Sequence, residues 1–330
     1  MKRKKIVVIG GGTGTYTVLS GLKKHPVDLS AIVSMTDSGG SNKVIRDEFG
    51  FLPTSDIRQC MVALASDDSH KLLRELFTYR YNQGTGITGM TFGNLFMAAL
   101  TDIYNSQEDA IKRTCEMLDV QGNIIPVTYD NVHLIARYDN GKQVLGEHYI
   151  DEPSEELGGH KIVELEIVPK AQTNKKALRV IKEADLVVLG PGDLYTSIIC
   201  NLIVGGMVRA IRKSKAKVIF VMNLMTRFGQ TNSFKSSDHL RELEKYLGKG
   251  VLDVCLINKT KSYPRGILKR YREEKAEPVK DDLQKNNNLR IIRRSFVSQK
   301  VYSKPKSDKL KRSLIRHDSK KLAKVIVSLL

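Results

Sequence analysis

Residues 5–22 read KIVVIGGGTGTYTVLSGL, and the fold follows from this stretch. The run at residues 6–9 is apolar and largely β-branched, which is typical of a strand buried on both faces of a parallel sheet. Residues 15–22 then carry apolar side chains at helical spacing. The turn between them is rich in glycines, which can adopt positive φ and leave backbone N–H groups open: Gly10, Gly11, Gly12 and Gly14. Because a helix N-terminus also favours negative charge, the stretch predicts a phosphate-binding turn.

The glycine turn matches neither of the two common phosphate-binding motifs. In the dinucleotide fingerprint G-x-G-x-x-G, the third glycine would fall on Thr15 or Thr17, depending on which glycine starts the motif. The lysine and the following Ser/Thr of a P-loop are also missing, which disfavours a P-loop NTPase. The turn by itself therefore leaves open a second interpretation, in which its glycines serve only tight packing of strand against helix.

Length and charge set broad limits. The chain has 330 residues, enough for one large α/β domain or two closely joined ones. It carries 54 Lys and Arg against 36 Asp and Glu, a formal net charge of +18. This excess fits an anionic ligand, a nucleic acid or an acidic membrane surface, and equally a solvated basic surface.

Other sequence features concern location and metals. We find neither an export signal nor an apolar run long enough to span a bilayer. The four cysteines and seven histidines lack metal-ligand spacing. We therefore expect a cytoplasmic protein with reduced thiols and no metal site built from His and Cys.

Several later apolar runs also end in small or polar residues. These runs lie at residues 29–36, 185–189, 218–222 and 252–257, and we predict helices at 57–65, 71–81, 94–104 and 174–184. In open parallel sheets, ligands bind beyond the carboxyl ends of the strands, so these ends should meet in one crevice. The pattern predicts an α/β fold with a mainly parallel sheet.

Three polar residues, one after a predicted strand and two at the starts of predicted helices, are candidates for ligand contacts. Asp37 follows the second strand, where an acidic group can bind a ribose hydroxyl, although a solvated turn aspartate is the alternative. Asp56 either caps the next helix or belongs to a site, and Asn94 either contacts a ligand or is an N-cap. A third glycine turn, GPGD at residues 190–193, follows the strand at 185–189.

Residues 123–169 change from helical to alternating periodicity. We predict strands at 124–128, 132–138, 143–150 and 162–168, with a hairpin at Asp-Asn-Gly 139–141. We expect this range to form an antiparallel β insertion that serves as a lid or dimer surface, and we assign it no chemistry. Beyond it we expect an edge strand at 289–297, a mobile basic segment at 298–318 and a helix at 320–330.

Several blocks together resemble the CofD-like family and, within it, the YvcK branch of bacterial gluconeogenesis factors. In order, the blocks are IGGGTGTYTVLSGL, DSGGSNKVIRDEFGFLPTSDIR, FGNLFMAAL, LGPGDLYTSIICNLIVGG, NLMTRFGQT, RYREEKAEPV and RHDSKKLA. They cover nearly the whole chain, so this resemblance is far more specific than one glycine turn.

The resemblance implies a single α/β domain over residues 1–330, with a Rossmann-like, doubly wound, mainly parallel sheet and helices on both faces. It also implies a crevice for a nucleoside diphosphate. The transferase branch moves a phospholactyl group from a guanosine diphosphate conjugate to a deazaflavin, with magnesium. The YvcK branch is linked to binding of UDP-N-acetylglucosamine and to cell shape and cell-wall growth on gluconeogenic carbon sources.

The resemblance also implies site residues. The nucleotide- and phosphate-binding residues would be Gly11, Gly12, Thr13, Gly14, Asp37, Ser38, Gly39, Gly40, Asn94, Gly190, Gly192, Asp193, Tyr195, Thr196, Asn201, Asn223, Thr226, Tyr271 and Arg316. Among these, Tyr271 would stack on the nucleotide sugar and Arg316 would bind its diphosphate. A magnesium ion would bind near Asp37, Asp56 and Asp193.

The chain departs from the YvcK pattern at four places. Ser55 replaces a glycine, Met90 a histidine and Cys200 a proline, and Lys43-Val44 stands where glycine-arginine is expected. These changes leave the first glycine turn intact. They argue against chemistry that needs the histidine and against contacts from the second turn to a base.

Three functions stay open at this point. A UDP-N-acetylglucosamine sensor without turnover is favoured, because no acid–base pair, nucleophile or complete metal cluster can be placed, and catalytic residues stay unassigned. A magnesium-dependent transferase acting on a GDP-type conjugate is the second function, since positioning does most of the work in phosphate chemistry. NAD-dependent redox chemistry is weaker, because the fingerprint is imperfect.

The expected partners follow from charge. The basic C-terminal segment should contact an acidic protein or the inner membrane surface. A specific nucleic acid is not expected, because the basic residues lack interleaved aromatics. We also expect a homo-oligomer.

Overall fold

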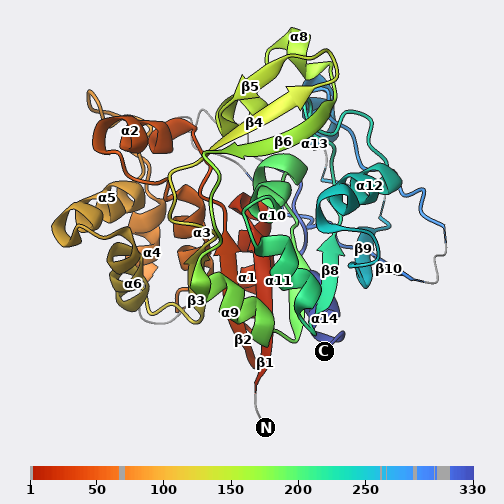
Figure 1. Ribbon diagram of the computed structural model, residues 1–330, viewed down its shortest axis with the longest axis horizontal. Coiled ribbons are helices and arrows are strands. Elements are labelled where there is room, and N and C mark those ends of the chain that lie inside the picture. The colour runs from red at the N-terminus through yellow and green to blue at the C-terminus, as the bar shows by residue number, and fades with distance from the viewer. Residues whose placement is uncertain are drawn as a thin grey trace.

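The computed structural model describes residues 3–66, 71–260, 262–264, 266–284, 288–300, 302 and 313–330. The strand predicted from the opening sequence is β1 (Lys4–Gly10). On one side β1 pairs in parallel with β2 (Val27–Val33), and on the other with β7 (Leu186–Leu189) (Figure 1). The first strand of the chain is therefore an interior strand of the sheet.

The main sheet has seven strands, and every neighbouring pair is parallel. The order is β10-β9-β8-β7-β1-β2-β3, where the remaining strands are β3 (Asn123–Pro126), β8 (Lys217–Val221), β9 (Val254–Asn258) and β10 (Arg290–Arg294). The chain runs outward from β1 to β3, returns to the other side at β7 and continues outward to β10. This doubly wound arrangement places a crevice between β1 and β7, where the direction of the strand order reverses.

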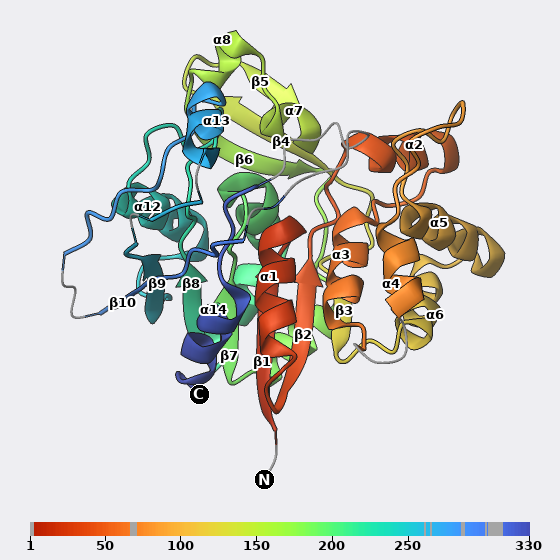
Figure 2. The same cartoon turned by 180° about the vertical axis from the view of Figure 1, so that it is seen from behind.

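The two faces of the sheet bury alternate side chains of β1. Ile6 and Val8 belong to one apolar cluster, whereas Val7 and Ile9 belong to the other. The first cluster is covered by α1 (Gly12–Leu22), α3 (Ser55–Leu64) and α14 (Ser319–Val327), and the second by α9 (Lys175–Glu183) and α11 (Met207–Lys213). Figure 1 shows the α9–α11 face and Figure 2 the α1–α14 face. Because each fully buried aliphatic side chain contributes about 1.5–3 kcal/mol, the two layers hold the sheet firmly.

The remaining helices lie around this framework. They are α2 (Gly40–Phe49), α4 (Lys71–Thr78), α5 (Phe92–Tyr104), α6 (Gln107–Met117), the π-helix η1 (Leu194–Ile199), α10 (Cys200–Leu202), α12 (Ser236–Leu247) and α13 (Ile267–Glu273). Helices α2, α4, α5 and α6 gather on the β3 side of the molecule (Figure 2). The predicted fold class is confirmed.

A second sheet rises above the carboxyl ends of the main strands (Figure 1). Its order is β5-β4-β6, with antiparallel pairs formed by β4 (His133–Tyr138), β5 (Gln143–Leu145) and β6 (Ile162–Val168). Two short helices, α7 (Glu147–Asp151) and α8 (Glu155–Gly158), connect β5 to β6. We call residues 133–168 the insertion.

Two details of the predicted insertion are wrong. The strand near residue 124 is β3, which pairs in parallel with β2 and so belongs to the main sheet. The strand predicted at 143–150 ends at Leu145, because Gly146 adopts φ +105 and the chain then turns into α7. The second correction matters for function, since α7 reaches the candidate site.

The C-terminal predictions have mixed outcomes. The strand predicted at 289–297 is β10, and it forms one edge of the main sheet. Of the predicted basic segment 298–318, residues 301 and 303–312 lie outside the described residues. All four cysteines are free. In the part of the chain that the structure describes, no helix combines the length and apolar character needed to cross a membrane.

Candidate functional site

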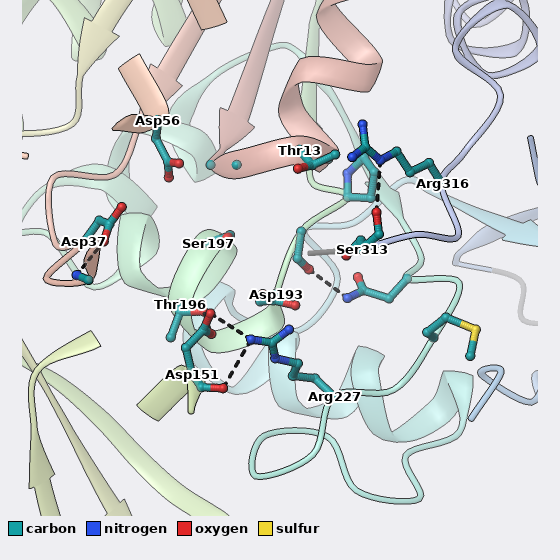
Figure 3. A pocket seen from close by; sticks show the side chains of 18 of the residues that line it. Thr13, Asp37, Asp56, Asp151, Asp193, Thr196, Ser197, Arg227, Ser313 and Arg316 are labelled. Carbon is teal, nitrogen blue, oxygen red and sulfur yellow. Dashed lines mark hydrogen bonds and ion pairs between the residues drawn. The ribbon is translucent and has the colours of Figure 1, made fainter. Parts of the chain in front are cut away.

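A cavity of about 210 Å³ opens at the carboxyl ends of the main strands. It is lined by the turns after β1, β2 and β7, by the loop after β8, by α7 of the insertion and by residues 313–317. Figure 3 shows side chains from these segments facing one another across the cavity. The ends of β1, β2, β7 and β8 therefore meet in one crevice, as the sequence predicted, whereas the described residues directly after β9 do not line it.

The turn after β1 forms one wall through the start of α1. The N-cap of α1 is Gly11, which has no side chain to bond to the first-turn N–H groups, and Gly12 has φ +60. Gly14 packs against the third glycine turn so closely that an added Cβ would lie 2.0 Å from the carbonyl oxygen of Pro191. The residues expected to meet phosphate at this turn, Gly11, Gly12, Thr13 and Gly14, all line the cavity.

The turn after β2 presents a second helix start. Its carboxylate, Asp37, accepts hydrogen bonds from the Gly39 backbone N–H (2.9 Å) and the Asn42 side-chain amide (2.5 Å). Gly39 is the N-cap of α2 and again has no side chain to cap the helix. Asp37 and Gly39 both line the cavity, so two uncapped helix N-termini face the same space.

The turn after β7 supplies Gly192, Asp193 and Thr196 to the cavity. Burial raises the pKa of Asp193 to about 6; Arg227 opposes this shift and Asp151 adds to it. Nearby, the Asn223 side-chain amide donates to the Gly192 carbonyl oxygen at 2.8 Å. The buried amide oxygen of Asn223 has no hydrogen-bond partner within the described ranges, which leaves an acceptor for a ligand.

Tyr271 and Arg316, both predicted to contact the ligand, line the far wall of the cavity, and their contacts differ. Tyr271 lines the cavity, but it is only 7% exposed and its hydroxyl accepts hydrogen bonds from the backbone N–H groups of Leu314 and Ile315. Arg316 lies with its guanidinium carbon 4.1 Å from the centre of the Tyr302 ring. Tyr271 therefore anchors the segment that carries Arg316, whatever else it contacts.

Carboxylates outnumber cations around the first two turns. Asp37, Asp56, Glu147, Asp151 and Asp193 all line the cavity. Burial raises the pKa of Glu147 well above its usual range, and the charges of Asp37, Asp151 and Asp56 add to the shift. The Asp56 carboxylate lies directly against the first turn, because a Cβ on Gly11 would be 2.2 Å from its Oδ2. The wall of the cavity therefore carries several carboxylates near the turns where a phosphate is expected to bind.

The structure brings the three candidate magnesium ligands, Asp37, Asp56 and Asp193, to the same cavity. Among the described residues, however, no group of three His, Cys, Asp or Glu side chains could hold a metal ion. These carboxylates fit magnesium only as a partial ligand set, and oxygens of a bound phosphate would have to complete the coordination.

Six of the predicted contact residues do not line the cavity: Ser38, Gly40, Asn94, Gly190, Tyr195 and Asn201. Asn94 is fully buried and bonds to Arg58, Ser41 and Ser55, and the N-cap of its helix is Thr91. The Tyr195 hydroxyl donates to the Ile162 carbonyl oxygen. Asn201 is buried and donates to the Ser197 carbonyl oxygen. These three side chains join elements of the fold and are turned away from the ligand space.

Six charged residues of the cavity escaped the sequence analysis: Arg80, Glu147, Asp151, Glu152, Arg227 and Glu274. Glu147 and Asp151 belong to α7, which was predicted as the end of a strand, and the insertion was assigned no chemistry. Their i, i+4 spacing places both carboxylates on one face of a helix, and this signal was available. Arg227 lies in the loop after β8, within the block NLMTRFGQT. The resemblance assigned only Asn223 and Thr226 of this block to the ligand.

The four places where the chain departs from the expected sequence pattern lie in different parts of the structure. Met90 is buried in a small apolar cluster with Ile45 and Ala98, away from the cavity. Cys200 is buried and bonds to the Thr196 carbonyl oxygen. Lys43 and Val44 are exposed on α2. Of the four places, only Ser55 lines the cavity.

Comparison with known proteins agrees with this architecture. The family model described as 2-phospho-L-lactate transferase CofD matches residues 6–297. The chain belongs to the CofD family. Within this family, the gluconeogenesis factor of Bacillus subtilis is 36% identical over 100% of this chain and 99% of its own length. A relative from Thermotoga maritima, whose name also contains gluconeogenesis factor, is 41% identical over 98% of both chains. A crystal structure of a Bacillus halodurans protein superimposes with a TM-score of 0.89 at 33% identity, covering 99% of this chain and 100% of that one.

Proposed function

We propose that this CofD-family chain is a gluconeogenesis factor that binds UDP-N-acetylglucosamine and regulates cell shape and cell-wall growth on gluconeogenic carbon sources without turning the ligand over. One observation carries the binding part of the proposal. Two helices, α1 and α2, begin at glycine N-caps on the wall of one cavity. The N–H groups at the start of two helices, and the positive ends of the two helix dipoles, suit the two phosphates of a nucleotide sugar.

The acidic wall bears on how a diphosphate would enter. A phosphate at the first turn would approach the Asp56 carboxylate, which lies against Gly11. The negative charges of the phosphate and of Asp56 would repel each other when they are this close. Asp56 must therefore either move away or share a cation with the phosphate. Asp37 and Asp56 could provide magnesium with part of its oxygen ligands, and the diphosphate would provide others. Magnesium dependence is therefore a measurable property of the site.

The test is calorimetric titration with UDP-N-acetylglucosamine, then with GDP and NAD, each with and without magnesium. The proposal expects the UDP-sugar to bind most tightly and to be recovered chemically unchanged. Arg316→Ala should weaken binding, whereas Arg241→Ala should not, because Arg241 pairs with Asp238 on α12, away from the cavity. Failure of the UDP-sugar to bind would overturn the proposal.

Tyr271 needs two substitutions, because its ring and its hydroxyl have different contacts. Tyr271→Phe removes only the acceptor for Leu314 and Ile315, so it tests the anchor. Tyr271→Ala also removes the ring that lines the cavity. If the ring stacks on the ligand, Ala should weaken binding far more than Phe. Equal losses would assign Tyr271 to anchoring alone.

The acidic wall also favours a second function, a phospholactyl-type transferase. Metal-assisted group transfer from a nucleoside diphosphate conjugate needs charge neutralisation and positioning more than a protein nucleophile. Under this function, GDP would bind only with magnesium and better than the UDP-sugar. The same titrations therefore separate the two functions.

A further inference from the structure

Arg227 is a cation of the cavity wall that neither the motifs nor the family resemblance assigns to a ligand. It begins a tight turn in which its backbone N–H donates to Thr231 Oγ1 (2.8 Å) and its carbonyl oxygen accepts from the N–H groups of Gln230 (3.1 Å) and Thr231 (2.8 Å). The next residue, Phe228, packs so tightly on the insertion that a Cβ on Gly158 would lie 2.2 Å from its ring. The backbone that carries the guanidinium is therefore well fixed.

The guanidinium itself is held from one side only. Its Nη2 donates to the Asp151 carbonyl oxygen (3.2 Å) and to Asp151 Oδ2 (3.0 Å). Asp151 is in turn fixed, because its Oδ1 accepts from Thr196 Oγ1 (2.8 Å) and from Gln230 Nε2 (2.6 Å). Figure 3 shows this carboxylate and the guanidinium bonded at the edge of the cavity, with Asp193 above Arg227.

Most of the hydrogen-bonding capacity of Arg227 is unused. An arginine has five N–H donors, and both hydrogens of Nη2 are directed to Asp151. Nε and Nη1 have no hydrogen-bond partner among the residues that the structure describes. Burial lowers the pKa of Arg227, but Asp151 and Asp193 outweigh it and hold the pKa above its usual range. A permanently charged fork with free donors therefore lines the cavity.

We propose that Arg227 binds the phosphate oxygens of the nucleotide ligand, and that Asp151 of the insertion is its positioning residue. This inference rests on the proposed function, because it assumes that a nucleoside diphosphate enters the cavity. The planar fork of arginine suits bidentate contacts to phosphate, and Asp151 presents that fork in one orientation. The insertion would then take part in ligand binding through α7.

The competing explanation is that Arg227 only balances the buried carboxylates of Asp151 and Asp193. In that case its loss would disturb the cavity as a whole and weaken every ligand alike. A phosphate contact, in contrast, should affect only ligands that carry phosphate. The comparison of a nucleotide with its nucleoside separates the two explanations.

The experiment uses the full chain, with UDP and uridine as probes in NMR titrations that also measure weak binding. Arg227→Ala should lower the affinity for UDP at least tenfold, equivalent to about 1.4 kcal/mol, and leave uridine affinity unchanged. Arg227→Lys should recover part of the UDP affinity, because it keeps the charge without the fork. Asp151→Asn should weaken UDP less than Arg227→Ala. Arg241→Ala is the matched arginine control.

Two results would overturn the inference alone. One is a UDP affinity of folded Arg227→Ala within threefold of the parent chain or, should that variant not fold, a UDP affinity of Arg227→Lys equal to that of the parent chain. The other is an equal loss for UDP and uridine, which is what a purely structural arginine predicts. If the parent chain binds neither UDP nor UDP-N-acetylglucosamine, the proposed function fails as well, so the two failures are distinguishable.

Discussion

Gly14→Ala tests the contact between the first and third glycine turns. An ideal Cβ on Gly14 would lie 2.0 Å from the Pro191 carbonyl oxygen and 2.6 Å from its carbonyl carbon. Real Cβ contacts below 3.0 Å essentially do not occur, so the two turns would have to separate by about 1 Å. The obstacle is backbone on both sides, which cannot rotate away as the end of a side chain can.

The size of the effect follows from two opposing contributions. Forcing an extra carbon into a tightly packed contact costs about 1–3 kcal/mol, and a rigid backbone neighbour places Gly14 near the upper end. Alanine is also a better helix residue than glycine, by about 1 kcal/mol. The net loss should be about 2 kcal/mol. For a chain of 330 residues this corresponds to a fall in Tm of about 3 °C.

Gly14→Ala should also weaken ligand binding, because a displacement of about 1 Å breaks hydrogen bonds from the first-turn N–H groups. Differential scanning fluorimetry measures the Tm, and calorimetry with UDP-N-acetylglucosamine measures the affinity. Gly159→Ala is the control: Gly159 has φ −76, and its Cβ would lie 3.6 Å from the nearest atom, an ordinary contact. If Gly14→Ala matches this control in both Tm and affinity, the two turns do not pack as closely as the structure indicates.

Three further predictions concern buried polar groups. Asn94→Ala should destabilise the chain by about 2–3 kcal/mol in urea unfolding, because it removes the acceptor of the buried Arg58 Nε–H, and the ligand affinity of the folded variant should not change; a large loss of affinity would show that Asn94 belongs to the site. Tyr195→Phe should cost about 1 kcal/mol through the lost bond to Ile162 and also spare ligand affinity, and a selective loss of affinity would contradict its placement outside the cavity. Burial lowers the pKa of His317 to about 4, so the folded state keeps this ring neutral while the unfolded state takes up a proton below about pH 6.5. Stability is thus retained above pH 6.5 and lost by up to about 3 kcal/mol as the pH falls to 4, and His317→Gln should remove that part of the pH dependence of unfolding; an unchanged profile would show that His317 is not its source.

The sequence predicted the parts of the fold that depend on local pattern. The strand at 6–9, its glycine turn and the following helix are encoded within eighteen consecutive residues, and hydrophobic runs marked β2, β7, β8 and β9. The run near residue 124 was also predicted as a strand, but it was assigned to the insertion and not to the main sheet. The strand ends could be expected to meet, because a parallel sheet places all carboxyl ends on one side. Edge position was also readable for β10, whose sequence RIIRR is rich in arginine.

What the sequence could not supply is the rotation of each helix about its axis and the contacts between distant segments. Asn94 and Tyr195 lie in helices that start near the cavity, but helix rotation turns their side chains into the fold. Asp151 and Arg227 are 76 residues apart, and only the packing of the β8 loop on the insertion brings them together. No local spacing encodes such a pair.

The interior position of β1 in the sheet has a consequence for biosynthesis. As the chain leaves the ribosome, β1 gains its first neighbour, β2, almost at once, but its other edge waits until β7 at Leu186–Leu189 has been made. During that interval an apolar strand has one open edge, a known template for intermolecular pairing. Polypeptides released before Leu186 should therefore aggregate. The nascent chain would benefit from a chaperone during the same interval.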